Sequence, residues 1–277
     1  MKIPLYVIIS ILVLFLVYLA MICPWQSAKR RRKFASTALL CPYAHRGLHG
    51  SGIPENSLEA FKAAVENGYG IELDIQLSID GEVMVFHDYT LDRMTGVAGA
   101  LSEKTAEELN LLRLAGTSSH IPTLKEVLTL VDGRVPLLIE LKGESTDTSL
   151  PPRANEILRG YTGEYCIESF NPILVAWYRK NRPEIMRGQL YTNVCREKKA
   201  STLNILLTLM MFNFIAQPDF VAFDHKYSNS PPLKLVLGVF KPLRFTWTIR
   251  DNNGFDVARK TKAKPIFEGE LPSDFAK

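Results

Sequence analysis

Residues 71–77 of the chain read IELDIQL, and the alternation of side chains in this stretch decides the fold. Apolar residues occupy its first, third and fifth positions, and Glu72 and Asp74 stand between them. Successive side chains of a β-strand point to opposite faces, so the pattern predicts one apolar face and one face with two carboxylates. Two like charges on one face repel unless a cation or a basic side chain lies between them. We therefore expect a strand that lines a charged site.

On both sides of this strand in the sequence, short apolar runs typical of strands alternate with segments that have the apolar spacing of helices. The candidate strands are Tyr43–Gly47, Ile71–Leu77, Val135–Leu141, Tyr165–Phe170, Met186–Tyr191, Phe220–Asp224, Leu243–Ile249 and Lys264–Glu268. The candidate helices lie near residues 57–67, 123–131, 152–160, 172–181, 200–215, 231–239 and 254–261. Eight strands that alternate with helices predict an α/β fold, a (β/α)8 TIM barrel over residues 41–277.

The spacing between the second and third barrel strands is too long for one helix. Asp80-Gly81, followed by the strand-like residues 82–86, predicts a hairpin, because Asp-Gly favours a two-residue turn. We therefore expect a small insertion after the second strand, and this insertion carries His87.

The amino-terminal segment is apolar and uncharged over residues 3–22, about the length that a helix needs to cross a bilayer. We interpret residues 1–33 as one transmembrane helix with a basic flank, KRRRK at 29–33. A cleaved signal peptide is the rival interpretation, but no small-x-small cleavage site follows the apolar run. The basic flank predicts a single-pass protein of the cell membrane with a cytoplasmic body. The flank either also attracts the body to anionic headgroups or serves as a topology signal alone.

A second apolar segment, residues 203–216, raises the question of a further membrane contact. It is short for a span and contains Asn204, Thr208 and Asn213. We therefore expect an outer helix packed on the barrel.

The charge of the body excludes a nucleic-acid partner. Residues 1–33 contain six basic residues and no acid, so the whole-chain charge of +4 leaves −2 for residues 34–277. A slightly acidic domain lacks the positively charged surface that nucleic-acid binding needs.

The four cysteines are irregularly spaced, which predicts free thiols in a reducing compartment. One convincing span also excludes a transporter or a channel subunit.

Polar side chains gather where the predicted strands end, which is where barrel enzymes carry their active sites. They are His45 and Arg46 at the first strand, Glu72 and Asp74 on the second, His87 after the hairpin, and Glu140 and Lys142 at the third. Three carboxylates on neighbouring strands offer the oxygen ligands that Mg²⁺ or Ca²⁺ prefers. The alternative is a lattice of ion pairs in which Arg46 and Lys142 neutralise the acids.

The basic members of this set predict phosphoryl chemistry. Two imidazoles can serve as base and acid near neutral pH, Arg46 offers a planar fork for phosphate oxygens, and Lys142 adds a point charge. Carbohydrate hydrolysis would need two carboxylates but neither the histidines nor Arg46. We therefore expect metal-assisted hydrolysis of a phosphate ester.

Five ordered motifs resemble those of the glycerophosphodiester phosphodiesterases. They are AHRG at 44–47, PENS at 54–57, ELD at 72–74, VFHD at 85–88 and ELK at 140–142, with weaker similarity at ESF 168–170 and TWT 246–248. The resemblance implies a (β/α)8 barrel that hydrolyses glycerophosphodiesters to glycerol 3-phosphate and an alcohol. Two departures stand out. Ser57 replaces a more frequent Thr, and the last strand lacks an Asp that many members have, a role left open between Glu268 and Glu270.

The resemblance also implies roles for single residues. By motif, His45 and His87 are the catalytic base and acid, in either order; Glu72, Asp74 and Glu140 are metal ligands; Arg46 and Lys142 contact the substrate phosphate. Glu55 supports the site or touches the metal, Asn56 fixes its loop, and Trp247 is an aromatic wall beside the glycerol or a core residue. The implied partners are Mg²⁺ or Ca²⁺ and a small-molecule or lipid-derived phosphodiester.

Two other functions are compatible with these residues. A site held at a bilayer could act on membrane lipids as a lysophospholipase D. A non-catalytic, membrane-tethered phosphate-binding barrel is the second alternative, and the presence of both histidines and all three acids argues against it.

Overall fold

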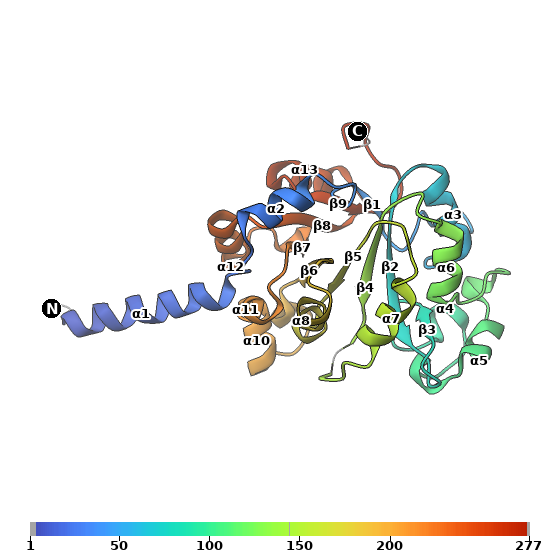
Figure 1. Cartoon of the computed structure of the whole chain (residues 1–277), viewed down its shortest axis with the longest axis horizontal. Helices are drawn as coiled ribbons and strands as arrows, with labels where there is room; N and C mark the ends of the chain where they lie inside the picture. Colours follow the sequence, from blue (N-terminus) through green and yellow to red (C-terminus); the bar gives the residue numbers. More distant parts are fainter. Residues whose placement is uncertain (1–3, 144, 276–277) are drawn as a thin grey trace.

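The predicted TIM barrel is confirmed by the computed structural model, which describes residues 4–143 and 145–275 (Figure 1). Within these residues the parallel barrel strands are β1 (Tyr43–Ala44), β2 (Gly70–Leu77), β4 (Leu137–Leu141), β5 (Tyr165–Ser169), β6 (Met186–Tyr191), β7 (Phe220–Asp224), β8 (Leu243–Ile249) and β9 (Lys264–Phe267). β1 pairs in parallel with both β2 and β9, which closes the sheet. All eight predicted strands are present, although β1 ends before the predicted Gly47.

Helices cover the outside of the barrel. They are α3 (Leu58–Glu66), α6 (Leu124–Val131), α7 (Leu150–Leu158), α8 (Pro172–Asn181), α11 (Asn213–Ala216), α12 (Pro231–Leu235), which continues as a π-helical turn (Val236–Phe240), and α13 (Asn252–Thr261). Side-chain caps begin α3 and α8, where the side chains of Ser57 and Asn171 accept hydrogen bonds from backbone N–H groups of the first turn. A short turn, His225–Tyr227, follows β7.

The strands are apolar on both faces near their amino ends. Ile71, Leu73 and Ile75 face outward into the main core, as the alternation in β2 predicts. Leu138 and Cys166 face inward and pack with aromatic residues such as Phe220. Because side chains alternate along a strand, the residues two positions further along β4 and β5 also face inward, nearer the carboxyl end of the barrel. Those residues are Glu140 and Glu168.

The predicted hairpin after the second strand is confirmed. β3 (Val83–Val85) pairs antiparallel with β2. The insertion then continues through α4 (Asp92–Thr95), a turn at Leu101–Glu103, α5 (Ala106–Leu111) and a turn at Leu114–Gly116. It has an apolar cluster of its own, which includes Phe86, Leu91, Leu101 and Leu109. His87 therefore stands on a separately packed unit at the rim of the barrel.

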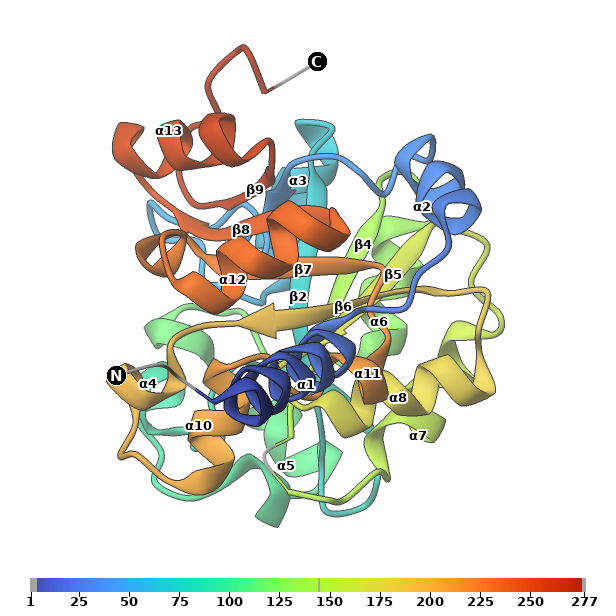
Figure 2. The ribbon, with the colours of Figure 1, turned by 90° about the vertical axis from the view of Figure 1, so that its left-hand side faces the viewer.

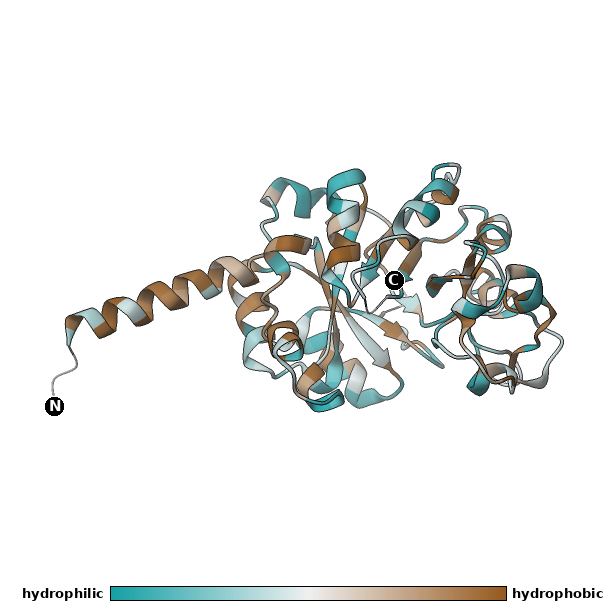
Figure 3. Cartoon of the chain, turned by 90° about the horizontal axis from the view of Figure 1, so that it is seen from below, coloured by the Kyte–Doolittle hydropathy of each residue, from teal (hydrophilic) through white to brown (hydrophobic). Residues whose placement is uncertain are grey.

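The amino-terminal helix α1 (Leu5–Ile22) projects from the barrel (Figures 1 and 2), and Figure 3 shows that most of it is hydrophobic. By length and composition it could cross a membrane, and a signal sequence would meet the same criteria. The sequence did not predict the next helix, α2 (Ala28–Ala35), which places Phe34 against the inner core at the amino end of the barrel.

The apolar segment at 203–216 differs from the prediction of one packed outer helix. It forms two short helices, α10 (Thr202–Thr208) and α11, preceded by α9 (Val194–Glu197). The chain turns between them, where Met210 has a positive φ of 58°. α11 packs against α8 and α1, but α10 has no buried residue. The prediction of a packed helix is therefore wrong for residues 202–208.

All four cysteines are free thiols, as predicted.

Candidate active site

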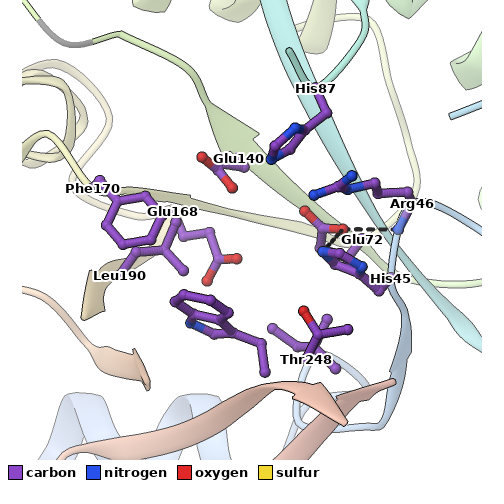
Figure 4. A pocket seen from close by; sticks show the side chains of 11 residues that line it. His45, Arg46, Glu72, His87, Glu140, Glu168, Phe170, Leu190 and Thr248 are labelled. Atoms are coloured by element: carbon purple, nitrogen blue, oxygen red, sulfur yellow. Dashed lines mark hydrogen bonds and ion pairs between the residues drawn. The ribbon is translucent and has the colours of Figure 1, made fainter. Parts of the chain in front are cut away.

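Three acidic residues from two neighbouring strands meet inside the carboxyl end of the barrel, and Figure 4 shows two of them, Glu72 and Glu140. Glu72 and Asp74 point inward from β2, and Glu140 on β4 is the register partner of Asp74. One carboxylate oxygen from each residue lies within 4.8 Å of the other two, and all three side chains are buried. The predicted acids are thus close enough to share one ion.

The turn after β1 presents His45 and Arg46 to these acids. Arg46 and Gly47 have φ values of 56° and 80°, and glycine adopts such values without strain. A β-carbon on Gly47 would lie 2.8 Å from Cβ of Ala60, so α3 can pack against the turn only if residue 47 has no side chain. The backbone N–H of Arg46 donates to Oε2 of Glu72 at 2.9 Å, which ties the turn to the site.

The imidazole of His45 lies between two carboxylates. Its Nδ1 is 2.7 Å from Oε1 of Glu268, and its Nε2 is 4.0 Å from Oε2 of Glu72. Arg250 donates two further hydrogen bonds to Glu268. Burial lowers the pKa of His45 to about 4, so the ring is neutral at pH 7. Of the two acids left open by the sequence, Glu268 contacts His45, and Glu270 is exposed.

A chain of ion pairs joins His87 to Arg46 around the rim. His87 Nδ1 is 2.6 Å from Oδ1 of Asp88, and Oδ2 of Asp88 accepts from Nε of Arg93 at 2.5 Å. Arg93 Nη2 also donates to Oε1 of Glu55 at 2.6 Å, and Glu55 accepts from Nη1 of Arg46 at 2.7 Å. Both arginines thus bind Glu55, which places it in a supporting position beside Arg46.

Asp74 is contacted by an amide and by a basic side chain. Asn56 Nδ2 donates to its Oδ2 at 2.9 Å, and Lys142 Nζ lies 3.5 Å from its Oδ1 and 3.0 Å from Oε1 of Glu140. Burial alone would raise the pKa of Asp74, but Lys142, followed by His87 and Arg46, holds it below its ordinary value. The ion pairs considered as an alternative to metal binding are therefore present around Asp74.

The negative charges of Glu72 and Glu140 are offset less well by nearby positive groups than the charge of Asp74 is. Burial, followed by repulsion from Asp74, raises the pKa of Glu72 well above its ordinary value. Burial also raises the pKa of Glu140 to about 7. Oδ1 of Asp74 is buried and accepts no hydrogen bond. Three close carboxylates with residual repulsion and an open acceptor fit a hard divalent cation such as Mg²⁺ or Ca²⁺.

One pocket brings five of the predicted polar residues together, and they are His45, His87, Arg46, Glu72 and Glu140 (Figure 4). Apolar side chains form the opposite wall of this pocket. This wall contains Phe170, Leu190 and Trp247. The rings of Phe170 and Trp247 meet edge to face, with centroids 5.6 Å apart. The indole Nε1 of Trp247 donates to the carbonyl of Ala222 at 3.0 Å. Trp247 is therefore part of the pocket wall and not only of the core.

Comparison with known proteins agrees with this geometry. A profile of the Glycerophosphoryl diester phosphodiesterase family matches residues 45–268. The chain belongs to this family. It is 35% identical over 162 residues to a glycerophosphodiester phosphodiesterase of Caldanaerobacter subterraneus, a match that covers 53% of this chain. The chain spans 65% of the length of that relative and 62% of the length of one from Bacillus subtilis.

Solved structures of the glycerophosphoryl diester phosphodiesterase family are similar over most of the chain. A glycerophosphodiester phosphodiesterase from Thermotoga maritima is 26% identical with a TM-score of 0.63, and the match covers 82% of this chain and 93% of that one. An Oleispira antarctica phosphodiesterase in complex with the product sn-glycerol-3-phosphate is 22% identical with a TM-score of 0.69, covering 86% and 94%. At that identity the second likeness shows the fold alone.

One acid of this glycerophosphoryl diester phosphodiesterase domain was quoted only within the weakly similar ESF at 168–170 and was given no role from the sequence. Glu168 on β5 is the register partner of Glu140, lines the pocket and is 1% exposed. Its Oε2 is buried and accepts no hydrogen bond, and burial raises its pKa well above the ordinary value. The alternation of β5, with Cys166 and Glu168 on one face, was the available signal.

Proposed function

We propose that this chain is a metal-dependent phosphodiesterase that hydrolyses glycerophosphodiesters to glycerol 3-phosphate and an alcohol, with Mg²⁺ or Ca²⁺ held by Glu72, Asp74 and Glu140. The observation that carries the proposal is the meeting of three buried carboxylates within 4.8 Å in a pocket that also contains both histidines. A divalent cation bound there polarises the phosphate and stabilises the negative charge of the transition state.

The chain's own side chains supply proton transfer and further positive charge. A water molecule attacks phosphorus, and the P–O bond to the leaving alcohol breaks. Of His45 and His87, one takes a proton from the attacking water and the other donates a proton to the leaving alkoxide. Arg46 and Lys142 bind the phosphate oxygens. Both basic residues are already held at the acids by hydrogen bonds and ion pairs, so little reorganisation is needed.

The remaining pocket residues orient these groups. Glu55 aligns the guanidinium of Arg46, and Asn56 holds the carboxylate of Asp74. Trp247 provides a flat apolar surface for the glycerol moiety. The neighbouring apolar side chains Phe170 and Leu190 support a second substrate class, lysophospholipids, which a lysophospholipase D reaction would cleave.

The membrane is part of the same proposal. Residues 1–33 form a single-pass anchor in the cell membrane, and residues 41–277 form the catalytic domain on the cytoplasmic side. Arg30 of the basic flank binds the carboxylate of Asp219, and Arg31 donates to the carbonyl of Lys241 at 3.0 Å. These contacts join the flank to the barrel.

The test is release of glycerol 3-phosphate from glycerophosphocholine by the full chain in detergent, with Mg²⁺ or Ca²⁺ and with EDTA. We expect turnover with metal, loss of turnover with EDTA, and a loss of at least about 100-fold for His45→Ala and Glu72→Ala. His120→Ala is the matched control, because His120 pairs with Glu126 outside the pocket. Undiminished turnover by His45→Ala or Glu72→Ala protein would remove the proposed mechanism.

A further inference from the structure

The inner end of α1 is fixed on the barrel by side-chain hydrogen bonds. The hydroxyl of Tyr18 donates to the carbonyl of Leu209 at 3.2 Å, and Nδ2 of Asn213 donates to the carbonyl of Ile22 at 2.9 Å. Ile22 is buried in the same apolar cluster as Met210. The connection between β6 and β7 therefore covers the last turn of α1 and sets the direction in which α1 leaves the barrel.

The part of α1 that is free of the barrel is too short to cross a bilayer by itself. α1 is exposed from Leu5 to Val17, apart from the partly covered Val7. At a rise of about 1.5 Å per residue this stretch is about 20 Å long, whereas the hydrocarbon core of a bilayer is about 30 Å thick. For α1 to cross, the hydrocarbon has to reach the level of Tyr18–Ile22, where the barrel already packs against the helix.

At that level the barrel carries exposed apolar side chains. Leu203 and Ile205 of α10 are 54% and 46% exposed, and Phe214 of α11 is 39% exposed. Because α10 has no buried residue, Leu203 and Ile205 are largely left out of the core. Figures 1 and 2 place α10 and α11 on the side of the barrel from which α1 leaves. Leu203 and Ile205 thus leave two large apolar side chains exposed on one short helix, beside the exposed end of the next helix in the chain.

We propose that Leu203, Ile205 and Phe214, here called the α10 surface, lie in the same bilayer leaflet as the inner end of α1. The inference rests on the proposed membrane anchor. Lipid is the occupant because α1 leaves the barrel beside this surface and is itself too short without it. The surface lengthens the apolar zone to match the bilayer. Arg196 and Lys199, exposed just before α10, suit the anionic headgroups at the edge of that zone.

The same connection starts at the pocket. Leu190 of β6 lines the pocket wall, and the chain then runs through α9 to the α10 surface.

The experiment measures lipid contact of single labelled sites in the full chain in phosphatidylcholine–phosphatidylglycerol vesicles. Cys23, Cys41 and Cys195 are changed to Ser, and the buried Cys166 is kept. One cysteine at a time, Leu203→Cys or Ile205→Cys, carries an environment-sensitive fluorophore, and brominated lipids serve as quenchers. Leu14→Cys in α1 is the positive control. Leu111→Cys on α5 is the negative control, because Leu111 is 71% exposed and Figure 1 shows α5 far from α1.

We expect brominated lipid to quench the labels at 203 and 205 at least half as strongly as the label at 14, and to leave the label at 111 unquenched. Quenching at 14 with none at 203 and 205 overturns the inference and leaves the anchor in place. Absence of quenching at 14 overturns the anchor itself, and the inference with it. Turnover of glycerophosphocholine in detergent, unchanged in each labelled variant, verifies that the barrel is folded.

Discussion

Glu268 on the loop after β9 accepts a hydrogen bond from Nδ1 of His45 at 2.7 Å. Partial burial alone would raise the pKa of Glu268, but hydrogen bonds from His45, His49 and Arg250 hold it below the ordinary value. An ionised carboxylate can only accept, so Nδ1 carries the proton and Nε2 presents its lone pair to the site. The position of Glu268 therefore selects the tautomer of His45.

Removal of this carboxylate should slow the reaction without weakening substrate binding. For Glu268→Ala we expect kcat to fall about 10- to 100-fold with KM nearly unchanged, because the general acid–base contribution of His45 is partly lost. Steady-state kinetics with glycerophosphocholine measure this split. Glu270→Ala is the matched control, since Glu270 is exposed two residues away. Equal effects of the two substitutions would contradict the assigned role of Glu268.

The contact between His45 and Glu268 also shows where prediction from sequence ends. Alternation within β2 and β4 is local, so it predicts the inward position of Glu72, Asp74 and Glu140 from a few neighbouring residues. His45 and Glu268 are 223 residues apart. Their contact exists because β1 closes the barrel against β9, and a local pattern carries no signal for a pairing of that kind.

The same reasoning applies to the less regular parts of the chain. Arg93 bonds Glu55 across 38 residues and Arg30 bonds Asp219 across 189 residues, and neither contact has a periodic signature. α10 has the composition of a buried helix, yet its side chains remain outside the core. Composition gives hydrophobicity, whereas burial depends on which surface the rest of the fold presents.

Loss of Arg93 should break the chain of ion pairs that joins His87 to Arg46. In Arg93→Ala protein, Asp88 and Glu55 lose their shared partner, so both His87 and Arg46 are held less firmly. We expect kcat/KM to fall on the order of tenfold, because catalytic groups that are less well positioned lose part of their orientation advantage. Arg113→Ala is the control, since Arg113 donates only to nearby carbonyls of the same insertion among the contacts described for it. Unchanged kinetics in Arg93→Ala protein would show that the ion-pair chain does not position the site.

Two glycines with similar backbone angles should respond differently to substitution. Gly47→Ala should destabilise the protein by about 2–4 kcal/mol, because it combines a φ of +80° with a β-carbon 2.8 Å from Cβ of Ala60. Gly52→Ala, at a φ of +87° with no atom within 4 Å, should cost only about 1 kcal/mol. Chemical unfolding of the two variants measures the difference. Equal losses would show that α3 does not pack closely on the turn.

Metal should stabilise the protein most at high pH. In the folded, metal-free chain burial raises the pKa of Glu140 to about 7 and that of Glu72 well above its ordinary value. The unfolded chain therefore releases these protons at lower pH than the folded chain does. Because the folded state binds more protons at these two carboxyls, their contribution to the stability of the folded chain falls as pH rises from about 4.5 to above 7.

A bound divalent cation needs the ionised carboxylates, so its affinity rises over the same range. We expect the increase in melting temperature on addition of Mg²⁺ or Ca²⁺ to be small at pH 5 and to grow steadily to pH 8. Thermal unfolding with EDTA and with metal across this range measures it. Glu140→Gln removes one titrating ligand and should flatten the dependence, whereas Glu126→Gln, outside the pocket, should leave it unchanged. A metal effect that is independent of pH would mean that the cation does not bind at these acids.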